Sequence, residues 1–193
     1  RLQGDWSSDV CSSDLVDAFI VNSAGCGNCM KHYPELFRED AEWHERAQRF
    51  ASKVRDVQEF LAEIPLDPAL PQGCQKLTYH DACHLAHGQG IRQAPRQLLR
   101  EIAGEGYREL GDADLCCGSA GTYNVTHFET ASQLLDKKVE AILATGAEVV
   151  GVANPGCLLQ IRYGLERCAS SVKAEHPVVL LNEAWKSENQ SNT

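Results

Sequence analysis

Short apolar runs alternate with longer amphipathic stretches along the chain. The runs KLTYH (76–80) and EVVGV (148–152) are rich in β-branched or aromatic residues, which predicts buried strands. The stretch PRQLLREIAG (95–104) predicts a helix, and YREL (107–110) a short extended segment. Strands that alternate with helices predict an α/β fold with mostly parallel pairing.

A longer helix is expected to begin near residue 126. Thr126 and Glu129 have the spacing of a capping box, and Gly146 stands where a C-terminal cap would lie. The apolar stripe expected on this helix consists of Phe128, Leu135, Val139 and Ile142 or Leu143.

Two stretches of the chain resemble each other, VDAFIVNSAGCGNCMKHY (16–33) and AEVVGVANPGCLLQIRYG (147–164). Both run from an apolar strand through a small-residue turn and a Gly-Cys pair into a helix. Downstream, 53–64 and 172–185 each read as a short extended segment followed by a helix. An internal repeat of this kind predicts two related structural units.

The first fifteen residues are set apart from these units. Residues 5–15 (DWSSDVCSSDL) match the translation of a sequencing-library adapter at every position, so 1–15, with Cys11, are excluded as an artefact. The Pro and Gly content of LDPALPQG (66–73) predicts a linker. The expected organisation is an adapter-derived segment at 1–15, the C-terminal part of a first repeat at 16–66, a linker at 67–75, a second repeat at 76–186 and a polar tail at 187–193.

Composition narrows the class of protein. With 43% hydrophobic residues in 193, the chain is able to bury a core, and its net charge of −9 without a basic cluster argues against nucleic acid as a partner. No apolar run reaches membrane-spanning length and no signal peptide is recognisable, which predicts a cytoplasmic protein. Nine cysteines in a reducing compartment indicate metal binding or redox chemistry rather than disulfides.

Four of the cysteines stand where a strand or loop passes into the next element: Cys83, the pair Cys116 and Cys117, and Cys157. In doubly wound folds the carboxyl ends of strands meet at one crevice, so these thiols are expected to converge. Four thiolates suit a [4Fe-4S] cluster, and they suit zinc equally well. Buried structural thiols are the alternative interpretation, which adjacent cysteines in a Gly-rich loop make less favourable.

Residues near these cysteines are candidates for supporting roles. Gly118 lets the backbone pass close to a cluster, and a helix beginning near Cys157 would lower the pKa of its thiol. His80, His84 and His87 surround Cys83, where they would ligate metal, donate hydrogen bonds to sulfur, or simply pack.

Several other residues are predicted to have structural roles or have two equally good interpretations. Tyr123 and Asn124 follow the Cys-Cys-Gly loop at 116–118 closely enough to line the crevice where the cysteines are expected to converge. An ordinary turn explains these two residues equally well. Cys74 and Cys168 read as structural thiols without a role. Lys137-Lys138 is expected on a solvated helix face.

The spacing C-x32-CC-G-x38-C resembles the cysteine-rich CCG domain, which occurs in a heterodisulfide reductase component and in iron-sulfur subunits of several dehydrogenases. The phrases YHDACHLAHGQGIRQAPRQLLREI, DLCCGSAGTYN and ANPGCLLQIRYGL look like the glycolate oxidase iron-sulfur subunits in particular, over about residues 16–186. The fullest pattern of that family ends in C-x-x-C, but here Gln160 replaces the last cysteine. The first repeat keeps Cys26 and Cys29, which read as remnants of a site whose other cysteines are missing.

The resemblance implies an electron-transfer subunit without a catalytic residue of its own, inactive alone. Its partners would be flavin-containing subunits that oxidise glycolate to glyoxylate, and it would pass electrons toward a membrane quinone at the cytoplasmic side of the inner membrane. Complexes that oxidise lactate or glycerol 3-phosphate, or that reduce heterodisulfides, remain open as alternatives. A zinc-stabilised interaction domain that docks redox subunits is the alternative of another class.

Overall fold

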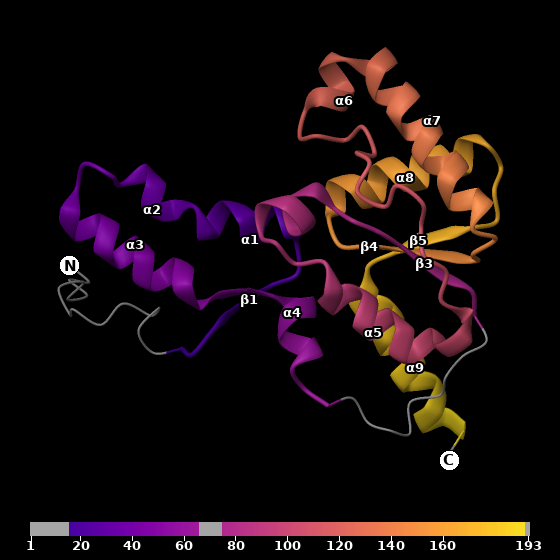
Figure 1. The fold of residues 1–193 in the computed structure, drawn as a ribbon, viewed down its shortest axis with the longest axis horizontal. Helices are drawn as coiled ribbons and strands as arrows, with labels where there is room; N and C mark the ends of the chain where they lie inside the picture. The colour runs from indigo at the N-terminus through magenta and orange to yellow at the C-terminus, as the bar shows by residue number, and fades with distance from the viewer. Residues whose placement is uncertain (1–15, 66–74, 192–193) are drawn as a thin grey trace, which may run out of the picture.

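The computed structural model describes residues 16–65 and 75–191, with side chains to residue 187, as two small parallel sheets flanked by helices (Figure 1). The segment expected to derive from an adapter, 1–15, lies outside the described residues. So do most of the expected linker and Cys74. The described chain bears out the prediction of an α/β fold built from mostly parallel strands.

The first half of the chain contains a two-stranded sheet. Strand β1 pairs in parallel with β2, with Phe19 opposite Val54. The elements of this half are β1 (Phe19–Val21), α1 (Ala24–Lys31), α2 (Tyr33–Leu36), α3 (Ala41–Lys53), β2 (Val54–Asp56) and α4 (Val57–Ala62). Figure 1 shows α1, α2 and α3 projecting from the body of the molecule, while α4 lies against α5.

The second half contains a three-stranded parallel sheet of order β3-β4-β5, with Leu77 opposite Val149 and Val149 opposite Lys173. Helices α7 and α8 lie on one side of this sheet and α5 and α9 on the other (Figure 1). The elements are β3 (Leu77–His80), the π-helical turn η2 (His84–Gly88), α5 (Gln93–Ala103), the 3₁₀ turn η3 (Gly104–Gly106), α6 (Tyr123–Thr126), α7 (Phe128–Ala144), β4 (Val149–Val152), α8 (Pro155–Arg167), β5 (Lys173–Glu175) and α9 (Pro177–Ser191).

The two halves repeat one order of elements, as the sequence similarity predicts. The series β1, α1, β2, α4 of the first half corresponds to β4, α8, β5, α9 of the second, with α2 and α3 inserted in the first. The segment 107–110 forms no strand, and Tyr107 makes only an isolated bridge to Leu77.

The core of the second half fills the space between the sheet and its helices. Strands β3 and β4 are buried along their whole length, which explains their continuous apolar sequences. Helices α7 and α8 cross at Gly164, where a Cβ would stand 2.7 Å from Cγ2 of Val139. Each large side chain buried here contributes roughly 1.5–3 kcal/mol to folding. This packing fixes where β3 and β4 end.

The expected capping box of the long helix is wrong. Helix α7 begins at Phe128, and Thr126 instead ends the short helix α6, where its hydroxyl donates to the carbonyl of Thr122. Phe128 is 58% exposed and does not belong to the apolar stripe, whereas Leu135, Val139 and Ile142 are buried. Gly146 adopts a φ of +64°, as a C-terminal cap requires.

The expected solvated position of Lys138 is also wrong. Its side chain is fully buried, and Nζ donates to the carbonyls of Asp112 at 2.7 Å and Ala113 at 3.1 Å. Lys138 lies three residues after Leu135, on the inner side of α7, while Lys137 is exposed. Helical spacing therefore separates the two lysines, one inside and one outside.

Among the described residues, no helix combines the length and the apolar character that a membrane crossing needs.

We expect Lys138→Met to lower the free energy of unfolding by roughly 1–3 kcal/mol, because two buried carbonyls lose their donor. Lys137→Met is the matched control on the same helix, and its change should stay below about 0.5 kcal/mol. Chemical denaturation followed by circular dichroism measures both. Equal stability of the two variants would show that the ammonium group does not hold the 112–113 backbone.

Candidate metal centre

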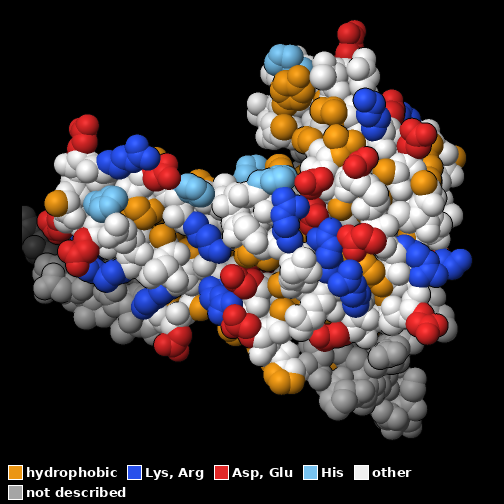
Figure 2. Space-filling view, in the orientation of Figure 1, with side chains coloured by type: hydrophobic (Ala, Val, Ile, Leu, Met, Phe, Trp, Pro, Cys, Tyr) orange, Lys and Arg blue, Asp and Glu red, His pale blue; other side chains and the backbone are white. Residues whose placement is uncertain are grey.

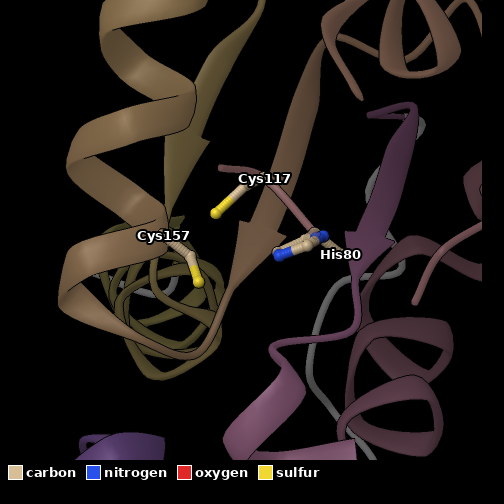
Figure 3. Close-up of side chains that lie close together, drawn as sticks. All are labelled: His80, Cys117 and Cys157. Carbon is tan, nitrogen blue, oxygen red and sulfur yellow. The ribbon is translucent and has the colours of Figure 1, made fainter. Parts of the chain in front are cut away.

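Three buried side chains from separate elements converge at the carboxyl end of the sheet (Figure 3). His80 ends β3, Cys117 lies in the loop before α6, and Cys157 lies in the first turn of α8. One ligand atom from each residue lies within 4.8 Å of the other two. His80 and Cys117 are 1% exposed and Cys157 is 5% exposed, so the group is closed to solvent.

Parallel pairing of the strands creates this meeting point. Because β3 and β4 are neighbours with His80 opposite Val152, both chains leave the sheet at the same edge. The chain after β4 turns at Asn154 and enters α8, which brings Cys157 beside the end of β3. The loop with Cys117 then covers the two strand ends.

Cys83 and Cys116 lie at the margin of this group, and both are half-buried. Burial raises the pKa of the Cys83 thiol, and the neighbouring sulfurs of Cys157 and Cys116 raise that pKa further. All four cysteines singled out in the sequence thus lie near one end of the sheet. The tightest group, however, contains His80 in addition to two of them.

The thiols polarise one another. A hydrogen bond from Cys117 lowers the pKa of Cys157 to about 4, against the opposing effect of burial. The same thiol lowers the pKa of Cys116 to about 6. The pKa of Cys117 itself is raised, because its proton is shared with both neighbours. Two thiolates flanking one thiol form a site prepared for a cation, whose binding would displace the remaining proton.

Gly118 shapes the loop that carries the cysteine pair. Its φ of +86° favours glycine, and a Cβ at this position would collide with the backbone carbonyl of Ala131 on α7. Its N–H donates to Sγ of Cys116 at 3.3 Å. Glycine therefore permits both the close packing of the loop on α7 and a backbone hydrogen bond to sulfur.

Asn154 has no predicted role in the sequence, yet it connects the two halves of the chain at the site. Its Nδ2 points a donor at Sγ of Cys157, 3.6 Å away, and its Oδ1 accepts from the N–H of Gly25 at 3.0 Å. The sequence does hold one clue to a role for Asn154, since an Asn directly before a helix usually caps that helix. Here the side chain makes no capping bond and contacts the sulfur and α1 instead.

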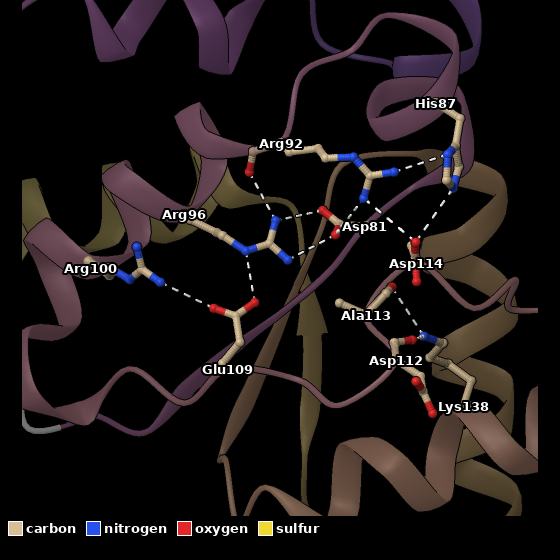
Figure 4. A network of polar contacts seen from close by, with 10 residues as sticks. All are labelled: Asp81, His87, Arg92, Arg96, Arg100, Glu109, Asp112, Ala113, Asp114 and Lys138. Carbon is tan, nitrogen blue, oxygen red and sulfur yellow. Dashed lines mark hydrogen bonds and ion pairs between the residues drawn. The ribbon is translucent and has the colours of Figure 1, made fainter.

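A network of charged side chains holds the loop against β3 (Figure 4). Arg96 forms two hydrogen bonds to the buried carboxylate of Asp81, both 2.8 Å long, and a third to Glu109. The N–H of Asp81 donates to the carbonyl of Ala113 at 3.0 Å. The residue after His80 is thereby tied to the segment that leads into the cysteine pair.

The remaining predicted residues take other positions. His84 and His87 are exposed, with Nδ1 of His84 3.9 Å from Sγ of Cys83. Figure 2 shows histidine side chains on the face over α1 and η2. Gln160 stands where the family pattern has a fifth cysteine. Its Oε1 accepts a hydrogen bond from the side chain of Asn124 at 3.0 Å.

Three cysteines lie apart from the buried group. Cys26 and Cys29 are exposed on α1, and Cys168 is exposed at the end of α8.

Tyr123 lies in the short helix α6, which follows the Cys-Cys-Gly loop. Its ring stacks on that of His127, with ring centroids 4.4 Å apart.

Comparisons with known proteins identify the family to which the chain belongs. The profile described as "Cysteine-rich domain" (CCG) matches residues 77–162. The chain is 43% identical over 174 residues to a protein named "Probable glycolate oxidase iron-sulfur subunit" from Bacillus subtilis (strain 168). That alignment covers 88% of this chain but 39% of the relative, so the chain spans about two fifths of that protein's length.

Proteins named for lactate utilization are similar over more of their length. "Lactate utilization protein A 2" of Bacillus mycoides (strain KBAB4) is 33% identical over 169 residues, covering 85% of this chain and 70% of the relative. "Lactate utilization protein A" of Bacillus subtilis (strain 168) is 32% identical over 166 residues, with the same two coverages. The chain therefore belongs to the family of cysteine-rich CCG proteins that includes glycolate oxidase iron-sulfur subunits and lactate utilization protein A.

Proposed function

We propose that this chain is part of an iron-sulfur electron-transfer subunit whose cluster is held by Cys83, Cys116, Cys117 and Cys157. The observation that carries the proposal is the convergence of thiols from three distant segments at one edge of the sheet, where Cys117 and Cys157 are buried and Cys83 and Cys116 lie beside them. Thiols brought together without a disulfide, in a family with iron-sulfur subunits, fit a metal cluster best.

The residues present fit a [4Fe-4S] cluster in number and kind. Four cysteine sulfurs supply its ligands, and the buried edge of the sheet limits access of solvent. The N–H of Gly118 already donates to a cysteine sulfur, as backbone groups near such clusters do. When bound, the cluster would supply one-electron redox chemistry.

The protein's own residues would tune and shield that chemistry. Lys138 is buried close enough to Cys117 for the sulfur's charge to act on its pKa, which burial lowers. A buried cation beside thiolates offsets part of their negative charge. The Nδ2 of Asn154 and the N–H of Gly118 direct further positive charge at two of the sulfurs.

The names of the relatives indicate the complex in which such a subunit works. One relative is named for glycolate oxidase and others for lactate utilization, so we infer a partner that oxidises a small 2-hydroxy acid. Flavin-containing subunits would perform the oxidation, and this subunit, without catalysing it, would carry the electrons toward a quinone at the cytoplasmic side of the membrane. The exposed thiols Cys26 and Cys29 would belong to a second site, that of the first repeat.

A zinc-stabilised docking domain is the second candidate, and one observation favours it. Metal–sulfur bonds of about 2.3 Å place the ligands of a tetrahedral ion roughly 3.8 Å apart. Three ligand atoms within 4.8 Å of one another approach that spacing as they stand.

Replacing cysteines individually separates these candidates. We expect Cys83→Ser, Cys116→Ser, Cys117→Ser and Cys157→Ser each to lose most of the iron and sulfide bound after anaerobic reconstitution, together with the absorption that dithionite bleaches. Cys168→Ser, which alters an exposed thiol away from the site, is the matched control and should keep both. Stoichiometric zinc without sulfide in the wild-type protein would contradict the cluster and support the docking domain.

Electron transfer itself is tested with the partner subunits present. In a complex purified from a host that expresses the full-length subunits, glycolate or lactate should bleach the cluster absorption under anaerobic conditions. The Cys157→Ser complex should still reduce its flavin but not an artificial quinone, because the path beyond the flavin is broken. Unchanged quinone reduction by that complex would exclude the relay.

A further inference from the structure

We propose that His80 is a direct ligand of the metal centre, through a ring nitrogen that acts together with the sulfurs of Cys117 and Cys157. The proposal deepens the proposed function and rests on it for the presence of a cluster. Figure 3 shows the imidazole of His80 at the end of β3, turned toward the two sulfur atoms. Its ligating nitrogen and both sulfurs lie within 4.8 Å of one another.

The hydrogen-bonding state of His80 points to a missing ligand. The side chain is 1% exposed, and neither Nδ1 nor Nε2 makes a hydrogen bond of ordinary geometry with the described groups, although the imidazole lies close enough to Cys157 to help lower the pKa of that thiol. A buried polar atom without a partner lowers the stability of the folded state. The exposed His87, by contrast, contacts both Arg92 and Asp114. Coordination of a metal would satisfy the nitrogen of His80 that faces the sulfurs.

The backbone fixes the position of the His80 ring before any metal binds. His80 is paired in the sheet opposite Val152, and the next residue, Asp81, is held by Arg96 and by the carbonyl of Ala113. Metal ligands positioned on a rigid strand need little rearrangement. Gln160 on α8, by contrast, already accepts a hydrogen bond from Asn124.

The resulting site would have two sides. His80, Cys117 and Cys157 form the buried side, while the half-buried Cys83 and Cys116 form the side nearer to solvent. Five protein donors would then face one centre. A neutral imidazole adds no negative charge where a thiolate would add one, and histidine ligation raises the potential of iron-sulfur centres.

Isotope labelling tests the ligation directly. The wild-type protein is reconstituted with iron and sulfide, reduced with dithionite and studied by pulsed electron paramagnetic resonance, with histidine at natural abundance and labelled with ¹⁵N. We expect a strong nitrogen coupling that changes isotope with the label. It should disappear in His80→Gln and persist in His84→Gln, the matched control beside Cys83.

Two further measurements keep the test decisive. His80→Cys should retain iron and lower the midpoint potential, because a thiolate replaces a neutral ligand. A loaded wild-type cluster without nitrogen coupling, or with coupling that survives in His80→Gln, would overturn the proposal while leaving the proposed function intact.

If iron and sulfide do not bind, loading with cobalt(II) tests ligation by His80 independently of the proposed cluster. Failure of reconstitution would refute the proposed function, and metal-free protein would then be loaded with cobalt(II) and examined by proton nuclear magnetic resonance. A strongly shifted imidazole N–H signal in the wild type, absent in His80→Gln, would support His80 as a ligand. Absence of that signal in the cobalt(II) wild-type protein would refute it.

Discussion

One backbone carbonyl, that of Ala113, ties together the segments from which the metal centre is built. It accepts hydrogen bonds from the N–H of Asp81, at the end of β3, and from the buried ammonium of Lys138 on α7. The loop that follows carries Cys116 and Cys117, and the strand that precedes Asp81 carries His80. This junction holds the cysteine pair over the ends of the parallel strands.

Charged side chains next to this junction also hold the loop with the cysteine pair in place. The Asp81–Arg96 pair is buried, so loss of either partner would leave an uncompensated charge beside the end of β3. Arg96 reaches Glu109 as well, so the pair is embedded in a network that leaves few alternatives for the loop. Asn154 adds a second connection, from Cys157 to Gly25 in the other half of the chain. Positions of the ligands thus depend on polar contacts between segments distant in sequence.

Much of the fold could be predicted because it follows from local pattern. The apolar runs that form β3 and β4, and the Gly-Cys repeats that open α1 and α8, carry their signal within a few residues. Convergence of cysteines could be expected as well, since parallel strands end at one edge. The approach of Cys117 and Cys157 within 4.8 Å agrees with that expectation, and the full set of ligands remains a proposal.

The parts that could not be predicted depend on contacts between distant segments or on stretches, such as the loop at 111–122, that have no periodic pattern. Lys138 reads as a residue of a solvated face because nothing in its neighbourhood reveals the carbonyls that it binds. Asn154 receives no role from the sequence, because its contacts with Gly25 and Cys157 exist only once α1 is placed beside it. The supposed capping box fails because the short helix α6 takes up Thr126 before α7 begins. In the first two cases the deciding contact comes from a distant segment.

X-ray absorption at the iron and zinc edges, on protein purified anaerobically from cells, tests the central claim most directly. The account predicts an iron edge with sulfur neighbours, a second shell of iron, and little zinc. A zinc edge with a single shell of sulfur and nitrogen, and no iron–iron scattering, would contradict it.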